Sequence, residues 1–246
     1  MTASTATVEV LPPDVDAAPA RSRRQRRGLD RSSGLLLWSV GQLPVVAYLW
    51  VALHRIGYPF ELEWLEGGAV SIVQRANAGH ALYVQPSLHY VPWPYPPLYF
   101  WVSAGVAQVT GVGFLALRLV SFTASLGAFA VIFTVVRSGS RDRVAGLVAV
   151  GLFAATFRFT GAWLDIGRVD SLFLLLFLIA VLVARRARTW RSGVTVGALV
   201  FLAFFTKQTA LVAAVPMLAW LLVRRPRLGA TALGTSAVLI VGSTLS

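Results

Sequence analysis

Long apolar segments separated by short polar ones are the dominant pattern of this 246-residue chain. The first, at residues 34–53, has about the 20 residues that a bilayer crossing needs. Further apolar segments follow at 115–136, 144–160, 171–184, 193–205, 209–223 and 229–246. We therefore predict an all-α fold, a polytopic transmembrane bundle of about seven spans. Because the chain ends inside the last apolar segment, we expect this transmembrane domain (34–246) to be truncated at its C-terminus.

Two other segments are not predicted to cross the membrane. Residues 1–33 contain Pro, Ala, Ser and Arg and have little apolar surface to bury, so we predict a disordered basic tail. Residues 97–111 are apolar, but a helix of this length extends only about 22 Å, short of the roughly 30 Å hydrocarbon core. We expect this segment to lie in the outer membrane interface as a helix.

The positive charge is concentrated in short clusters between the apolar segments. The formal net charge is +12, although only 13% of the residues are charged, against about 25% in soluble domains. The clusters lie at 21–31, 137–143, 185–191 and 224–227. Short basic loops mark the cytoplasmic side of a membrane protein, so we predict a multi-pass plasma-membrane protein with a cytoplasmic N-terminus. This topology explains the charge, and no nucleic-acid partner is required.

The long loop after the first span contains acidic residues on a predicted amphipathic helix at 63–79. At 100° per residue, Glu63 and Glu66 share a polar face, and Leu65 and Ile72 lie on an apolar one. Such a helix can lie in the membrane interface, with its apolar face in lipid and its carboxylates toward water or a cleft. The alternative is that the two glutamates are only a solvated face without chemical function.

Three further outer segments carry polar chemistry. Residues 91–99 contain four prolines among aromatic side chains and cannot be helical. Residues 163–171 contain Asp165, Arg168 and Asp170, either a functional group or a minor surface ion pair. Lys207, the only lysine, lies between two short spans, where it is either a phosphate ligand or an anchor at the interface.

These segments together place carboxylates and cations on one side of the membrane, which suits a reaction between an acceptor and an anionic lipid donor. The rival class, a transporter or flippase, would place charged residues near the middle of several spans. Here the charges lie at helix ends, which favours an enzyme. His80 and His89 lack ligand spacing and the chain has no cysteine, so no metal site is predicted.

The order of the motifs resembles the N-terminal half of the C-type (GT-C) glycosyltransferase superfamily. Its relatives include the protein O-mannosyltransferases and the lipid A aminoarabinose transferases. The motifs that carry the resemblance are Glu66-Gly67, Tyr95-Pro96-Pro97-Leu98-Tyr99, Leu117-Arg118-Leu119, Gly167-Arg168-Val169-Asp170 and Phe205-Thr206-Lys207-Gln208. They extend over about residues 34–225.

The resemblance implies transfer of a sugar from a polyprenyl-phosphate donor to an acceptor at the outer face. An acidic residue of the first outer loop then serves as catalytic base, and Glu66 matches it best, with Glu63 as the alternative. Asp165 or Asp170 matches the second acid. We expect Lys207, Arg168 and Arg118 to hold the donor phosphate. The sequence does not name the acceptor, and an inactive fragment is the remaining alternative.

Overall fold

The computed structural model describes residues 20–245, which fold into helices joined by turns and loops. The helices are α1 (Ala20–Arg55), α2 (Leu65–Asn77), α3 (Leu98–Thr110), α4 (Phe114–Ser140), α5 (Arg143–Ala155), α6 (Asp170–Arg186), α7 (Trp190–Phe204), α8 (Ala210–Arg224) and α9 (Pro226–Leu245). Within these residues the only β-pairing is an isolated bridge between Ser87 and Tyr90. The predicted all-α helical bundle is confirmed.

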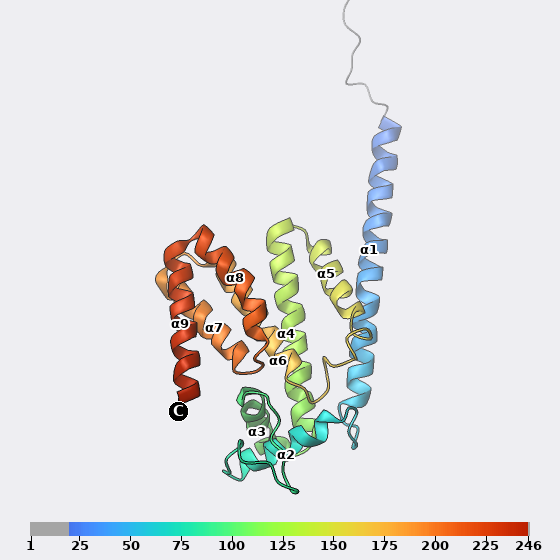
Figure 1. The fold of residues 1–246 in the computed structure, drawn as a ribbon. Helices are drawn as coiled ribbons and strands as arrows, with labels where there is room; N and C mark the ends of the chain where they lie inside the picture. Colours follow the sequence, from blue (N-terminus) through green and yellow to red (C-terminus); the bar gives the residue numbers. More distant parts are fainter. Residues whose placement is uncertain (1–19, 246) are drawn as a thin grey trace, which may run out of the picture.

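The long helices form a row of packed neighbours (Figure 1). α1 packs against α5, α5 against α4, α4 against α6, α6 against α7, and α9 against both α7 and α8. The two shorter helices α2 and α3 lie beside each other and against α4 at one end, which we call the α2–α3 end. The chain therefore places its longest loop, between α1 and α4, entirely at that end.

Helix length and surface both suit a bilayer. Residues Ser33–Arg55 of α1 and all of α4 are long and apolar enough to cross a membrane, whereas α5, α7 and α8 are shorter apolar helices. The outer surface of α1 exposes large apolar side chains, which would be costly in water. Examples are Leu35, Leu36, Leu43, Val46 and Trp50. These surfaces are what a lipid-facing helix requires.

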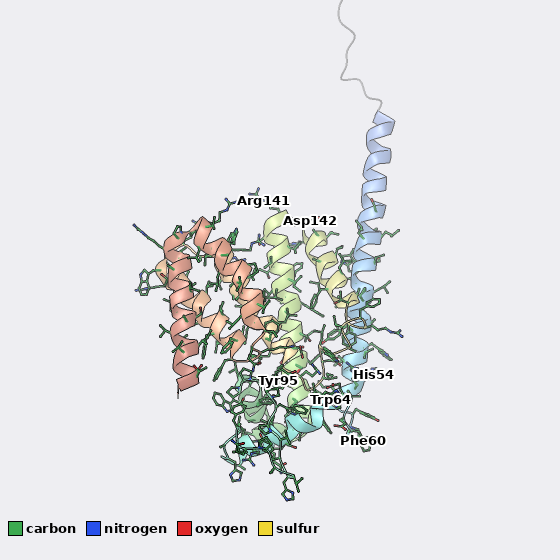
Figure 2. All side chains as sticks on the ribbon, viewed as in Figure 1. His54, Phe60, Trp64, Tyr95, Arg141 and Asp142 are labelled. Carbon is green, nitrogen blue, oxygen red and sulfur yellow. The ribbon has the colours of Figure 1, made fainter. Side chains whose placement is uncertain are left out.

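The basic clusters lie together at the end opposite α2 and α3. They fall at the α4–α5, α6–α7 and α8–α9 turns and at the start of α1. Figure 2 shows Arg141 and Asp142 at this basic end, far from Phe60 and Trp64 at the other. The alternating direction of the helices thus separates the basic turns from the acidic loop residues, as the sequence pattern predicts.

The short helix α3 stays at the α2–α3 end, as predicted for residues 97–111. Gln108 Nε2, near its C-terminus, donates to Asn77 Oδ1 at the end of α2 at 2.7 Å. The N-terminal residue of α4, Phe114, follows almost directly. α3 therefore does not traverse the bundle.

The described helices differ from the predicted segment boundaries in two places. Residues 20–33, predicted as disordered tail, belong to α1, since a helix once formed by the apolar span extends cheaply into preceding Arg, Gln and Leu residues. Residues 1–19 of that tail lie outside the described residues. The predicted span 144–160 is helical only to Ala155, and the chain then turns at 156–162.

The α1–α5 contact depends on two facing glycines. A Cβ atom on Gly151 would overlap the carbonyl oxygen of Gly41, so the backbones touch directly. Helix association in membranes commonly uses small residues in this way. We expect Gly151→Ala to lower the free energy of unfolding by about 1–3 kcal/mol, because the helices must separate.

Gly234 in α9 provides the matched control for this change. A Cβ atom there would meet nothing within 4 Å. Gly234→Ala should therefore leave the thermal unfolding midpoint in detergent unchanged or raise it slightly. Equal midpoints for the two alanine variants would contradict the close packing of α1 against α5.

Candidate functional site

Glu66 and Arg118 form a completely buried ion pair between α2 and α4. Both side chains are 0% exposed, and Arg118 Nη2 donates to Glu66 Oε2 at 2.7 Å. The Nε of Arg118 donates to the other carboxylate oxygen at 3.0 Å, which makes the pair bidentate. Arg118 also donates to three backbone carbonyls that precede α2, those of Arg55, Tyr58 and Phe60.

The remaining hydrogen-bonding capacity of Glu66 is also used. Its oxygens accept from the backbone N–H groups of Leu62 at 2.7 Å and Gly167 at 2.6 Å. Burial alone would raise the pKa of Glu66, but the hydrogen bonds from Arg118 and the two backbone groups outweigh it, and the pKa is lowered. Glu66 is thus a charged buried residue that joins α2, α4 and the loop before α6.

This geometry does not favour two roles that the resemblance implied. Glu66 is not placed to take a proton from an acceptor, because no oxygen of its carboxylate is exposed or free of partners. Arg118 is not placed to bind a donor phosphate, because it is wholly buried on Glu66 and backbone carbonyls. We interpret both residues as structural.

The apolar face of α2 likewise differs from the prediction. The apolar face that includes Ile72 was predicted to be able to lie in lipid, but Ile72 and its neighbours Ala69 and Val73 are buried against α3 and α4. Tyr99 of α3 and Leu117 of α4 belong to the same core cluster. The amphipathic pattern is therefore satisfied by protein packing, since α3 covers the face that a bilayer was expected to cover.

Asp165 pairs with Arg55 at the end of α1. Arg55 Nε donates to Asp165 Oδ2 at 2.6 Å, and its Nη2 contacts the other carboxylate oxygen. The same guanidinium donates to the carbonyl of Ala162 at 2.6 Å. Asp165 is only 2% exposed, so we interpret this pair as an anchor that fixes the loop before α6 to α1.

The other charged residues of the loops converge on one another. Arg168 Nε lies 3.0 Å from Asp170 Oδ2, and its Nη1 lies 3.3 Å from Glu63 Oε1. Lys207 Nζ donates to Asp170 Oδ1 at 2.6 Å. The predicted convergence of Lys207 and Arg168 beside Asp165 or Asp170 is confirmed, with Asp170 as the shared acid. Lys207 is 21% and Asp170 19% exposed, so this group is accessible where Glu66 is not.

Backbone contacts fix the segment that carries Lys207 against the proline-rich loop. Lys207 lies between α7 and α8, as predicted. Its neighbour Gln208 donates from Nε2 to the carbonyl of Pro94. The N–H of Leu98 donates to the carbonyl of Phe205 at 3.1 Å. The stiff loop 91–99 thus forms one wall of the site.

Trp163 is a contact residue that the sequence did not single out. The guanidinium carbon of Arg168 lies 3.9 Å from the centroid of its ring, a cation–π geometry. The turn before it has two left-handed residues, Gly161 (φ 79°) and Ala162 (φ 57°). Ala162 is an unfavourable residue for this conformation, and its hydrogen bond from Arg55 helps to hold it. The glycine was the only sequence signal for this turn.

A small pocket of about 20 Å³ adjoins the charged group. It is lined by Leu65 and Ala69 of α2, by aromatic side chains, and by the loop that bears Arg168 and Asp170. The aromatic residues are Trp93, Tyr95, Tyr99 and Phe100. Figure 2 shows Trp64 and Tyr95 on this side of the molecule. Among the described residues no group of three metal-binding side chains occurs.

Comparison with known proteins gives one match. Residues 94–245, more than half of the chain, match the family described as dolichyl-phosphate-mannose-protein mannosyltransferase. No curated protein and no solved structure matches the chain. The match includes Arg118, Arg168, Asp170 and Lys207 but begins after the glutamates of α2 and its preceding loop.

Proposed function

The chain belongs to the dolichyl-phosphate-mannose-protein mannosyltransferase family, whose members are membrane glycosyltransferases of the C-type superfamily, and we propose that it uses a polyprenyl-phosphate sugar as donor. The acceptor is a hydroxyl group at the outer face of the membrane, where the α2–α3 end lies. The basic end then faces the cytoplasm with the N-terminus, in accord with the positive-inside rule.

The observation that carries this proposal is the convergence of Glu63, Arg168, Asp170 and Lys207 from three segments of the chain. These four residues form a partly exposed group that contains carboxylates able to accept a proton and cations able to bind a phosphate. In the reaction the acceptor oxygen attacks the anomeric carbon and gives its proton to a carboxylate. The bond from that carbon to the phosphate oxygen breaks, and polyprenyl phosphate leaves with the bonding electrons.

We assign the cations to the leaving group. Negative charge develops on the phosphate as the glycosidic bond breaks, so Lys207 and Arg168 stabilise the transition state more than the ground state. In the absence of donor, the ion pair with Asp170 holds Lys207 close to the place where it would bind the phosphate. A bound phosphate would compete with Asp170 for Lys207. The planar fork of Arg168, held on the ring of Trp163, suits two phosphate oxygens.

We assign the base to Glu63 rather than to Glu66. Glu63 Oε1 lies 3.3 Å from Arg168 Nη1, and Oε2 accepts from the N–H of Leu65 at 3.0 Å. Asp170 instead lies between two cations, each within hydrogen-bonding distance, so its carboxylate oxygens are already engaged. Asp170 therefore positions Lys207 and Arg168 in this account.

An apolar groove beside the site is consistent with a polyprenyl chain. Its volume is about 490 Å³, and its lining comes from α3, α4 and α6, including Val102, Val106, Leu119 and Leu172. Leu172 lies in the first turn of α6, two residues after Asp170. A phosphate held at Lys207 would thus have an apolar surface beside it for the attached lipid.

The test is Glu63→Gln in a transfer assay with membranes or purified protein. Glutamine keeps the size of the side chain but removes the proton acceptor, so turnover should fall at least about 100-fold, the scale of general-base catalysis. The unfolding midpoint should change little because Glu63 is partly exposed. Glu61→Gln, an exposed glutamate in the same loop, is the control. Unchanged turnover in Glu63→Gln would end the assignment.

A further inference from the structure

A second large groove lies away from the proposed site, between α1 and α5. It has a volume of about 510 Å³ and is lined by Pro44, Ala47 and Val51 of α1, by Ala154 and Ala155 at the end of α5, and by Arg158 in the turn that follows. We call it the α1–α5 groove. Figure 1 shows these two helices side by side at one edge of the bundle, whereas α7 and α8, which flank Lys207, lie at the other side.

The groove exists because α5 ends early. α5 stops at Ala155, and the chain turns through 156–162, whereas α1 continues to Arg55. Backbone that leaves a helix is costly in hydrocarbon unless protein, water or polar headgroups cover it. The groove therefore has an apolar surface along α1 and a polar turn at one end. A phospholipid has the same arrangement, with an apolar acyl chain and a polar headgroup.

The two arginines of the groove differ in their partners. Arg55 is neutralised by Asp165 and also donates to the carbonyl of Ala162. Arg158 is exposed and has no hydrogen-bond or ion-pair partner in the described part of the chain. The groove thus carries one uncompensated positive charge at its polar end. An unpaired arginine at a membrane surface is expected to find an anionic partner.

We propose that the α1–α5 groove binds an anionic phospholipid, with an acyl chain along α1 and the phosphate on Arg158. The single free charge of Arg158 matches the single charge of a phosphodiester, and its fork suits two phosphate oxygens. The apolar lining provides a surface against which the acyl chain packs. This site is separate from Lys207 and Arg168 and does not depend on the transfer reaction.

The experiment is a native mass spectrometry titration of the purified protein in a neutral detergent. The lipids are phosphatidylglycerol, phosphatidylcholine and polyprenyl phosphate, and glycerol 3-phosphate serves as the headgroup without a chain. We expect one phosphatidylglycerol to bind with preference over phosphatidylcholine and glycerol 3-phosphate not to bind. Arg158→Gln should weaken phosphatidylglycerol binding at least about tenfold, because a charge-assisted hydrogen bond is lost.

Two further variants make the result specific to the groove. Ala155→Trp should fill the groove and weaken binding while Arg158 remains. Arg75→Gln, which removes a cation at the same end but outside the groove, should leave binding unchanged. Undiminished phosphatidylglycerol binding in both Arg158→Gln and Ala155→Trp would overturn the proposal. Tighter, Arg158-dependent binding of polyprenyl phosphate would also overturn it, since the groove would then belong to the donor.

Discussion

Glu66→Gln is expected to lower the free energy of unfolding by about 3–5 kcal/mol, because it leaves the Arg118 guanidinium buried without its counter-charge. Arg118 is 0% exposed and cannot turn to water. The loss should appear as a lower thermal unfolding midpoint in detergent and as reduced yield of monodisperse protein. Any loss of transfer in this variant then follows from loss of folded protein.

Two comparisons separate this structural role from catalysis. Glu61→Gln makes the same chemical change at an exposed position and should shift the midpoint little. Glu66→Gln combined with Arg118→Met removes both charges and should recover part of the stability. If Glu66→Gln unfolds like Glu61→Gln but cannot transfer sugar, the structural interpretation of Glu66 fails.

Lys207→Ala should lower turnover by about 10²–10³-fold, the effect of removing one preorganised group that stabilises a developing negative charge. Folding should be nearly unaffected, because Lys207 is 21% exposed and surface ion pairs contribute about 0–1 kcal/mol. Lys207→Arg restores the charge with different geometry and should regain part of the rate. The readout is turnover with a polyprenyl-phosphate sugar, with the unfolding midpoint measured in parallel.

Arg75→Gln is the control for Lys207. It also removes a cation at the α2–α3 end, but Arg75 donates to the carbonyl of Ala81 and lies over the ring of Tyr90. Its turnover should stay near that of the unmodified chain. Equal turnover in Lys207→Ala and Arg75→Gln would mean that Lys207 only anchors its turn at the membrane interface.

The helices were largely predictable because apolar length is a local signal. The spans at 115–136 and 171–184 correspond to α4 and α6, and the short segment at 97–111 to α3. Successive helices run in opposite directions, and this places the basic clusters together at one end of the bundle. What the pattern did not show was where α5 stops, since Phe157 and Phe159 continue the apolar pattern beyond Ala155.

The choice between the two glutamates required the tertiary structure. The helical pattern placed Glu63 and Glu66 on one face, but α2 begins at Leu65, so Glu63 lies outside the helix. The partner of Glu66 is 52 residues away in α4, and no spacing in the sequence joins them. The convergence of Lys207 and Arg168 was predictable because the predicted topology places the loop before α6 and the turn between α7 and α8 on the same side of the membrane.

The most direct test of the central claim is a cryo-EM structure of the protein with bound polyprenyl phosphate. The account predicts density for the phosphate within hydrogen-bonding distance of Lys207 Nζ and the Arg168 guanidinium, with the lipid chain in the groove between α3, α4 and α6. Glu63 should face the side from which an acceptor would approach. A phosphate bound elsewhere, on Arg158 or at the basic end, with Lys207 still paired only to Asp170, would contradict it.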